Sequence, residues 1–345
     1  MNIQNLIRPN ILKLKPYASA RDEFKDFEKS MTFLDANENP FETGLNRYPD
    51  PQQSALKLRL STIKNCNPNQ LLLGNGSDEV LDLIFRTFCE PGKDNVILLP
   101  PTYGMYEVLA NLNNIETIKI QLNTDFQPNV SDILKAANSN SKILFLCSPN
   151  NPTANSFEAE SMEALLQKFK GIVVIDEAYT DFSDSESWSS RLAEFPNLIV
   201  IHTLSKAYGL AGIRLGMGMA SPEIVSVLSS IKPPYNINQL TQQTALNKLE
   251  NLELVTNQIQ LIKNERIRVL SALQNIDFVK KRYPSDANFI LVQVDDANKR
   301  YKQLIEKEIV VRNRTKEPLC ENCLRFTIGT PDENTKLLTV LKSLI

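Results

Sequence analysis

A lysine follows closely on a strongly apolar run of the sequence, among residues that suit an anion. Lys206 comes three residues after the run Leu198–Thr203. Because burial disfavours the charged form of lysine, an amine at such a strand end is biased toward the neutral form that a Schiff base requires. Thr203, Ser205 and Arg214 offer two hydroxyl groups and one guanidinium that can hold a phosphate. The segment therefore predicts covalent amine chemistry beside a phosphate site.

Two further polar groups stand at the ends of apolar runs upstream. Asp176 closes the run that begins at Val173, and Tyr179 follows three residues later; Asn151 lies in a turn just after another apolar run. Taken singly, a surface lysine, a helix cap and an Asn-Pro turn would explain Lys206, Asp176 and Asn151. Together they favour one site, because open α/β sheets bind ligands in a crevice at the carboxyl ends of their strands.

The order of the apolar segments predicts the elements that position these residues. Near-continuous runs of Ile, Leu and Val are typical of strands in a parallel sheet that is covered on both faces. Such runs occupy residues 95–99, 115–120, 142–147, 171–175 and 198–203, and the alternation stops after residues 213–220. Helices are expected between them, including one that Ser77 caps and that ends before Pro91.

A second region follows the last of these runs. A long helical stretch at 238–274 leads to strands at 288–294, 309–312 and 324–328, with a helix at 296–307. We therefore predict an N-terminal arm over 1–45, a large α/β domain over 46–245, and a smaller α+β domain over 246–345 that the arm helps to complete.

Composition excludes several classes of function. The chain has one histidine, His202, so a multi-histidine metal centre is impossible and a serine-histidine-aspartate triad could be built only around this residue. His202 lies four residues before Lys206, and we expect it to pack rather than to act as an acid or base. With 38 basic and 40 acidic residues, no basic field for nucleic acid is available.

The sequence also bears on compartment. The longest apolar runs are far shorter than the roughly 20 residues of a membrane span, and the N-terminus has no apolar core of a signal peptide. We therefore expect no membrane partner. Five cysteines fit a reducing cytoplasm, and Cys320 and Cys323 are interpreted as two thiols near a turn rather than as metal ligands. No metal site is predicted.

The motifs are more specific as an ordered set than singly. Asn-Asn151-Pro-Thr, Asp176-Glu-Ala-Tyr179 and Ser-Lys206, with Arg214 eight residues further on, resemble the fold-type-I aminotransferases that depend on pyridoxal 5′-phosphate. Segments at 34–40, 46–50, 74–79, 101–106 and 324–330 are similar to the histidinol-phosphate aminotransferases, along essentially the whole chain. The resemblance implies a mostly parallel central sheet flanked by helices, a smaller α+β domain and an extended N-terminal arm. It also implies a homodimer.

The resemblance implies a role for each residue that would face the cofactor ring. Lys206 would form the Schiff base with the cofactor and later move a proton on the substrate. Asp176 would pair with the pyridine nitrogen and keep it protonated, since an opposite charge shifts a pKa by about 1–3 units. Asn151 and Tyr179 would bond the phenolic oxygen, and Tyr103 would stack on the ring.

The cofactor phosphate and the substrates would be held by further residues. In the family, the phosphate lies at a helix N-terminus, where backbone N–H groups and the helix dipole favour an anion. The corresponding residues here are Gly76, Ser77, Asp78, Thr203, Ser205, Arg214 and, from the neighbouring subunit, Tyr48. Arginines at 312 and 325 would grip the substrate phosphate or the glutamate carboxylate, joined by Tyr17; Asn37 would lie near the imidazole. Arg314 is expected to face solvent.

The resemblance thus implies reversible amino transfer between L-histidinol phosphate and 2-oxoglutarate, giving imidazole-acetol phosphate and L-glutamate. Two alternatives keep the cofactor: an aromatic amino-acid aminotransferase and a threonine-phosphate decarboxylase. A dinucleotide-binding protein is disfavoured because Gly74-Asn-Gly76 lacks the third glycine of that turn, and a non-catalytic scaffold because Lys206 and Asp176 are both present. One departure from the family is Ala154, where glycine is usual; alanine would cost about 1 kcal/mol if its φ is positive.

Overall fold

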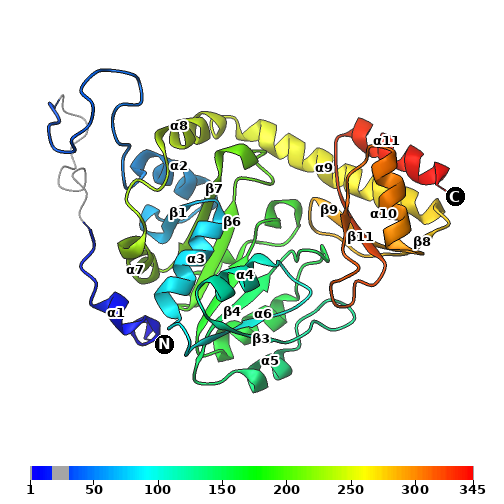
Figure 1. Ribbon diagram of the computed structural model, residues 1–345, viewed down its shortest axis with the longest axis horizontal. Coiled ribbons are helices and arrows are strands. Elements are labelled where there is room, and N and C mark those ends of the chain that lie inside the picture. The colour runs from blue at the N-terminus through cyan, green and yellow to red at the C-terminus, as the bar shows by residue number, and fades with distance from the viewer. Residues whose placement is uncertain (1, 18–30, 345) are drawn as a thin grey trace. The chain divides into compact units, whose positions relative to one another are not determined.

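The computed structural model describes residues 2–17 and 31–344 (Figure 1). Their strands form a seven-stranded, mostly parallel sheet and a four-stranded antiparallel sheet. The chain divides into two compact units, Met1–Glu90 with Trp188–Leu252, and Pro91–Ser187 with Glu253–Ile345. The first is called unit 1 and the second unit 2. The division at residues 45 and 245 stays a prediction.

Unit 1 carries three strands of the larger sheet in the order β1, β7, β6, all paired antiparallel. They are β1 (Leu71–Asn75), β7 (Leu215–Ala220) and β6 (Leu198–Thr203), and they are buried except at Asn75. The helices are α1 (Pro9–Leu12), α2 (Ser54–Lys64), α3 (Ser77–Phe88), α7 (Pro222–Ile231) and α8 (Gln239–Lys248). Helix α3 buries an apolar stripe against β1 and β7.

The start of α3 lies unusually close to β7. A Cβ atom added to Gly216 of β7 would lie 2.1 Å from the backbone nitrogen of Ser77, a distance that real structures do not tolerate. On the same strand, a Cβ on Gly218 would lie 2.8 Å from Val80 of the helix. Glycine at these positions lets helix and strand backbones approach each other, which fixes where the N-terminus of α3 lies.

Unit 2 carries four parallel strands in the order β5, β4, β2, β3. They are β5 (Ile172–Asp176), β4 (Ser141–Cys147), β2 (Asn95–Leu98) and β3 (Glu116–Lys119). The helices α4 (Met105–Leu112), α5 (Val130–Ala136) and α6 (Ala159–Lys168) lie between them in sequence. Strand β5 is completely buried, and it ends at Asp176.

The smaller antiparallel sheet of unit 2 has the order β10, β11, β9, β8. Its strands are β8 (Val279–Arg282), β9 (Phe289–Val294), β10 (Arg312–Asn313) and β11 (Cys323–Thr327). Helices α9 (Leu252–Ala272), α10 (Ala297–Glu306) and α11 (Pro331–Ser343) accompany them (Figure 1). Apolar side chains from these helices and strands form one core cluster.

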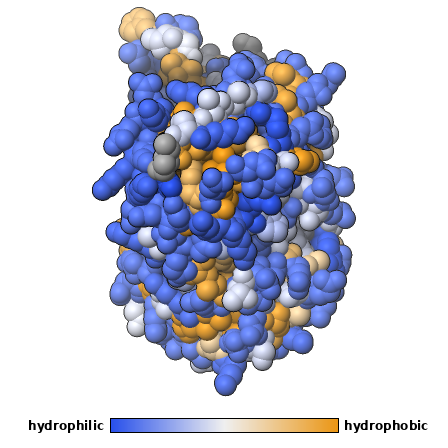
Figure 2. Space-filling view, turned by 90° about the vertical axis from the view of Figure 1, so that its right-hand side faces the viewer, coloured by the Kyte–Doolittle hydropathy of each residue, from blue (hydrophilic) through white to orange (hydrophobic). Residues whose placement is uncertain are grey.

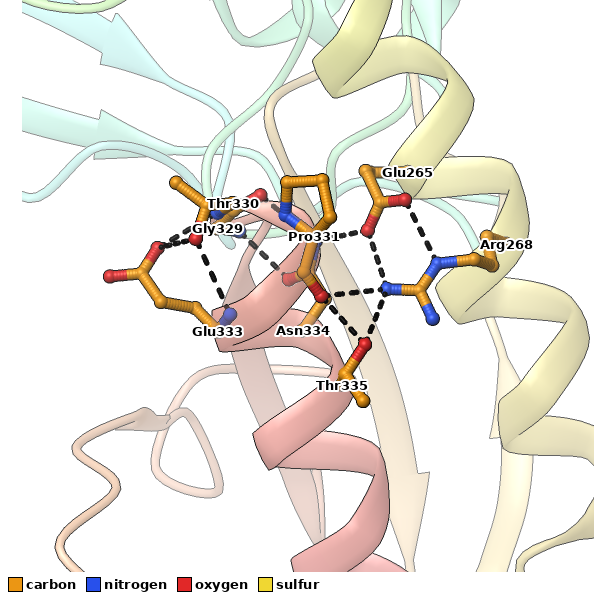
Figure 3. A network of polar contacts seen from close by, with 8 residues as sticks. All are labelled: Glu265, Arg268, Gly329, Thr330, Pro331, Glu333, Asn334 and Thr335. Atoms are coloured by element: carbon orange, nitrogen blue, oxygen red, sulfur yellow. Dashed lines mark hydrogen bonds and ion pairs between the residues drawn. The ribbon is translucent and has the colours of Figure 1, made fainter.

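A polar network ties α9 to the start of α11 (Figure 3). Arg268 donates to the Glu265 carboxylate from Nε at 2.9 Å and from Nη2 at 2.7 Å, and Asn334 Nδ2 donates to it at 2.8 Å. Thr330 and Glu333 form a capping box at the helix N-terminus. Because hydrogen bonds to charged groups are the stronger ones, this network anchors the segment that follows β11.

Three expected elements differ in the structure. The stretch 238–274 is broken into α8 and α9, because the carbonyl of the buried Leu249 accepts a hydrogen bond from Arg59 Nη2 at 2.6 Å instead of continuing the helix. Residues 309–311 are not strand, because Ile309 N–H bonds to Leu304 and closes α10. Gly76, rather than Ser77, is the N-cap of α3. Strands β1 and β8 and helix α11 were not among the predicted elements.

The face that Figure 2 shows is mostly hydrophilic, and its hydrophobic residues form separate patches. In the described ranges, no helix is long and apolar enough to cross a membrane.

Candidate active site

In unit 1, the predicted phosphate-binding residues meet at the start of α3. Gly76 has a φ of 74° and its N–H donates to the carbonyl of Arg214 at 2.6 Å. The Arg214 guanidinium lies 3.8 Å from the Asp78 carboxylate, and a Cβ on Gly76 would lie 2.8 Å from that guanidinium. The N-terminus of α3 and the Arg214 guanidinium therefore lie close together, and Gly76 places no side chain between them. Such an arrangement suits an anion.

The loop after β6 is built around a buried hydroxyl. The Thr203 hydroxyl accepts a hydrogen bond from Ser205 N–H at 3.1 Å and donates to the Leu215 carbonyl at 3.4 Å. Lys206 follows in a turn in which Gly209 N–H bonds to its carbonyl at 3.1 Å. The expected burial of Lys206 is wrong for this chain: the residue is exposed, because it lies in the turn beyond the strand.

His202 is buried within β6, with 1% of its surface exposed, as expected for a packing residue. Lys64 Nζ lies 3.0 Å from its Nε2, and the Tyr208 ring meets the imidazole edge-on at 6.3 Å. The imidazole is thus held by an amine on one side and an aromatic ring on another.

Tyr48 and Asn37 line one cavity of about 550 Å³ in unit 1. The Tyr48 ring is half exposed and stacks on Tyr235, with ring centroids 4.5 Å apart. The backbone N–H of Tyr48 donates to the Glu38 carboxylate at 2.7 Å. Tyr17 is 76% exposed and lines a different cavity, together with Arg86. Within unit 1, the structure brings Tyr48 and Asn37 to one cavity and leaves Tyr17 at another.

In unit 2, the Asp176 carboxylate is buried, and each of its oxygens accepts a hydrogen bond. The Tyr106 hydroxyl donates to Oδ2 at 2.7 Å, and Ala178 N–H donates to Oδ1 at 3.1 Å. Burial, the Asp176 charge and the Cys147 thiol raise the pKa of Tyr106 well above its usual value. The hydroxyl therefore keeps its proton and acts as the donor.

Tyr106 is a residue whose role the sequence interpretation missed. It is completely buried, stacks on Phe145 with ring centroids 4.7 Å apart, and meets the Tyr103 ring edge-on at 5.4 Å. The signal in the sequence was its position three residues after Tyr103 at the start of a helix, since residues three apart lie on one helix face.

Asn151, Tyr179 and Arg325 lie together in unit 2, although Asn151 and Arg325 are 174 positions apart in the sequence. Asn151 Nδ2 donates to the Tyr179 hydroxyl at 3.5 Å, and its Oδ1 accepts a short hydrogen bond from Arg325 Nη1. Burial raises the pKa of Tyr179 above its usual value, against the opposing effect of Arg325. Phe289 contacts both the Tyr179 ring and the Arg325 guanidinium, each at 5.0 Å.

Three arginines carry the positive charge of this region. Arg312 pairs with Arg325 across β10 and β11. Burial, and then the charges of Arg314 and Arg312, lower the pKa of Arg325 to about 10. Among the described residues, the buried Nε atoms of Arg325 and Arg314 have no hydrogen-bond partner. Arg314 is only 26% exposed, so the expectation that it faces solvent is largely wrong. Like charges gathered this way favour an anionic ligand.

Ala154 stands in a left-handed backbone conformation. Its φ is 71° and it is completely buried in the turn after Asn151, where Asp286 N–H donates to its carbonyl at 2.7 Å. Ala154 therefore has the positive φ at which alanine was expected to destabilise the turn relative to glycine.

We expect Ala154→Gly to stabilise the protein by up to about 1 kcal/mol, because glycine adopts a positive φ without strain. Thermal unfolding of the variant beside the unaltered chain measures this. Ala137→Gly, at a position with φ of -64°, is the control and should destabilise. An equal or lower midpoint for Ala154→Gly would show that the turn holds alanine without strain.

No group of three potential metal-ligating side chains occurs in the part of the chain that the structure describes. Cys320 and Cys323 are buried free thiols at a turn in which Cys323 N–H bonds to the Cys320 carbonyl at 2.9 Å. Their position agrees with the interpretation of two thiols near a turn.

Residues 24–341 match the family described as aminotransferase class I and II, and the chain belongs to this family of enzymes. The histidinol-phosphate aminotransferases of Christiangramia forsetii and Flavobacterium johnsoniae are each 61% identical to it, over 343 and 344 residues. These alignments cover 99% of this chain and 98% and 99% of those proteins.

A solved structure agrees with the sequence comparison. The crystal structure of the histidinol-phosphate aminotransferase from Clostridium acetobutylicum is similar, with a TM-score of 0.80 at 25% identity over 87% of this chain and 91% of that one. The predicted resemblance and the fold-type-I α/β class are thereby confirmed.

Proposed function

We propose that the chain catalyses reversible amino transfer between L-histidinol phosphate and 2-oxoglutarate, giving imidazole-acetol phosphate and L-glutamate, with pyridoxal 5′-phosphate as cofactor. The observation that carries the proposal is the partly buried Arg325 guanidinium, bonded to Asn151 and accompanied by Arg312 and Arg314. Both substrates present an anionic group that such a site binds. The names of the relatives at 61% identity support the same substrate.

The residues present fit this cofactor. Unit 1 offers the N-terminus of α3 beside Arg214, with glycine at position 76 where a Cβ would collide, and this suits a phosphate monoester. Unit 2 offers the buried Asp176 carboxylate, which suits a protonated ring nitrogen, and the Asn151 and Tyr179 donors, which suit a phenolic oxygen. When bound, pyridoxal phosphate supplies the electron sink that stabilises negative charge at the substrate Cα.

Each of these residues has one task in the proposed reaction. Lys206 Nζ would hold the cofactor covalently and, once the substrate amine has displaced it, would move the proton between the substrate Cα and C4′ of the cofactor. Asp176 keeps a proton on the pyridine nitrogen through its negative charge. Asn151 and Tyr179 donate to the phenolic oxygen, and Tyr103 packs on the ring face. Gly76, Ser77, Asp78, Thr203, Ser205 and Arg214 hold the phosphate.

The substrates and the assembly complete the proposal. Arg312 and Arg325 bind the phosphate of histidinol phosphate and, in the other half-reaction, the carboxylate of glutamate. Tyr17 and Asn37 contact the substrate. Tyr48 serves the active site of a second copy of the chain in a cytoplasmic homodimer. The strongly exposed side chains of Leu34 and Phe41, near Tyr48 in sequence, support a partner surface there, since such apolar groups are commonly covered.

Steady-state kinetics with histidinol phosphate, phenylalanine and threonine phosphate, measured side by side, test the proposed substrate. Histidinol phosphate should be the best amino donor of the three by kcat/KM. Phenylalanine lacks the anionic side group that the arginine cluster binds, and threonine phosphate should not lose carbon dioxide. Negligible turnover of histidinol phosphate beside efficient use of phenylalanine, or loss of carbon dioxide from threonine phosphate, would contradict the proposal.

The two paired arginines should differ in effect. Arg325→Ala is expected to raise KM for both substrates by about 10- to 100-fold, because hydrogen bonds to charged groups contribute about 1.5–3 kcal/mol and every 1.4 kcal/mol is tenfold. Arg312→Ala should raise KM chiefly for histidinol phosphate, whose dianion can accept a second guanidinium. Arg282→Ala, an exposed arginine of the same small sheet, is the control. Small, equal effects of all three changes would show that Arg312 and Arg325 do not bind the anionic group of the substrates.

A further inference from the structure

Tyr106 contacts two side chains to which the proposed function gives different tasks. Its hydroxyl donates to Asp176, which would pair with the ring nitrogen of the cofactor, and its ring packs edge-on against Tyr103, which would cover the ring face. Tyr106 itself is completely buried. It therefore contacts these two side chains rather than a ligand, and any effect it has on the reaction passes through them.

The contacts of Tyr106 fix its own position from three sides. Its N–H bonds to the Tyr103 carbonyl at 3.4 Å at the start of α4, and its ring stacks on Phe145 of β4 with an interplanar angle of 14°. With the ring held in this way, the hydroxyl oxygen can lie in only one place, 2.7 Å from Asp176 Oδ2. A buried aromatic ring packs equally well without a hydroxyl, so the hydrogen bond has an effect on Asp176 that is separate from packing.

The Asp176 carboxylate is oriented by two donors from within unit 2. Tyr106 serves Oδ2, and Ala178 N–H serves Oδ1. One donor on each oxygen fixes the plane of the carboxylate, and a hydrogen bond to a carboxylate stabilises its ionised form. The Cys147 thiol and the Tyr179 hydroxyl of unit 2 also act on this pair. Both are neutral in their protonated forms, so neither supplies the carboxylate with a positive charge.

We propose that Tyr106 is a positioning residue for cofactor binding and amino transfer: its hydroxyl keeps Asp176 ionised and oriented, and its ring sets the orientation of Tyr103. This inference rests on the proposed function, because it concerns the two residues that would hold the cofactor ring. It goes further by assigning the geometry of both to one buried side chain.

Tyr106→Phe separates the hydroxyl from the ring. Phenylalanine keeps the stacking on Phe145 and the contact with Tyr103, and it removes the donor to Asp176 together with the hydrogen bond between the hydroxyl and the Cys147 thiol. Tyr283→Phe is the matched control, since Tyr283 is a buried tyrosine of the same unit that packs on Phe126 and Lys281. Thermal unfolding of both variants establishes that each is folded.

The main readout is the dissociation constant of pyridoxal phosphate from the protein, measured between about pH 5 and pH 8. The constant for Tyr106→Phe should rise about tenfold, the effect of losing one charge-assisted hydrogen bond. The acid limb of its pH dependence should move up by about one unit, because a carboxylate that has lost a donor holds its proton to higher pH. With histidinol phosphate, kcat should fall about tenfold while KM stays unchanged.

A double-mutant cycle with Asp176→Asn tests whether the effect passes through the carboxylate. Tyr106→Phe should have no further effect on the dissociation constant in the Asp176→Asn background, and this readout keeps its meaning if either single variant loses stability. An unchanged constant and an unchanged acid limb in Tyr106→Phe, or full additivity in the cycle, would overturn the inference. Wild-type protein that binds pyridoxal phosphate but leaves histidinol phosphate unchanged would refute the proposed substrate, and the binding comparison would still decide the role of Tyr106.

Discussion

Lys206→Ala is expected to abolish amino transfer, with a loss of about 10⁴-fold or more in kcat, the upper end of what general acid–base catalysis alone contributes. In the proposed reaction this amine both holds the cofactor and moves the proton at the substrate Cα, so that two contributions are lost with one side chain. The turn in which Lys206 lies is held by backbone bonds, such as Gly209 N–H to the Lys206 carbonyl. Removing the side chain should therefore leave the fold intact.

Two controls sharpen this experiment. Lys206→Arg keeps a positive charge but cannot lose a proton at working pH, so it should be almost as inactive as alanine. Lys93→Ala, an exposed lysine elsewhere in the chain, should retain full activity. The visible absorption of the bound cofactor should change in both Lys206 variants and not in the Lys93 variant. Residual activity within tenfold of wild type would place the base at another residue.

Asp176→Asn is expected to lower kcat by about 10- to 10³-fold while the protein still binds pyridoxal phosphate at high concentration. An opposite charge shifts a neighbouring pKa by about 1–3 units, so removal of the charge lowers the protonated fraction of the ring nitrogen by the same powers of ten. Asparagine is nearly isosteric: its Oδ1 can accept from Ala178 N–H, and its Nδ2 can donate to the Tyr106 hydroxyl, which is also able to accept. The loss is therefore one of charge rather than of packing.

The kinetics should be compared with those of a carboxylate that has only a structural contact. Asp286→Asn removes a charge in the same unit, where the Asp286 carboxylate accepts a hydrogen bond from Ser156 N–H at 3.0 Å, and should leave kcat within about twofold of wild type. Full activity of Asp176→Asn would mean that Asp176 is a structural residue of the buried strand end.

The larger part of the fold could be predicted because buried parallel strands are apolar on both faces. Strand β4 and strand β5 are near-continuous runs of Ile, Leu, Val and Phe, a pattern typical of strands that are covered on both sides. Strand β8, Val279–Arg282, is Val-Lys-Lys-Arg and mostly exposed, so no apolar pattern marked it. The break between α8 and α9 depends on Arg59, 190 residues away from Leu249, and no local pattern reports such a contact.

For the site, the sequence predicted the residue types better than their surroundings. Asn151, Tyr179 and Arg325 were each expected, and the hydrogen bond between Asn151 and Arg325 depends on tertiary structure alone. The exposure of Lys206 was missed because an apolar strand says nothing about how the chain turns after it ends. The positive φ of Ala154 could be anticipated only as a condition, since alanine itself gives no sign of it.

The environment of His202 also makes the chain convenient to observe. Because the protein has one histidine, its imidazole protons give a single set of magnetic resonance signals, assigned without any substitution. That ring is buried on β6 four residues before Lys206 and lies against Lys64 and Tyr208. Its chemical shift is therefore a built-in reporter of changes on the strand that leads to the proposed catalytic amine, and it needs no added label.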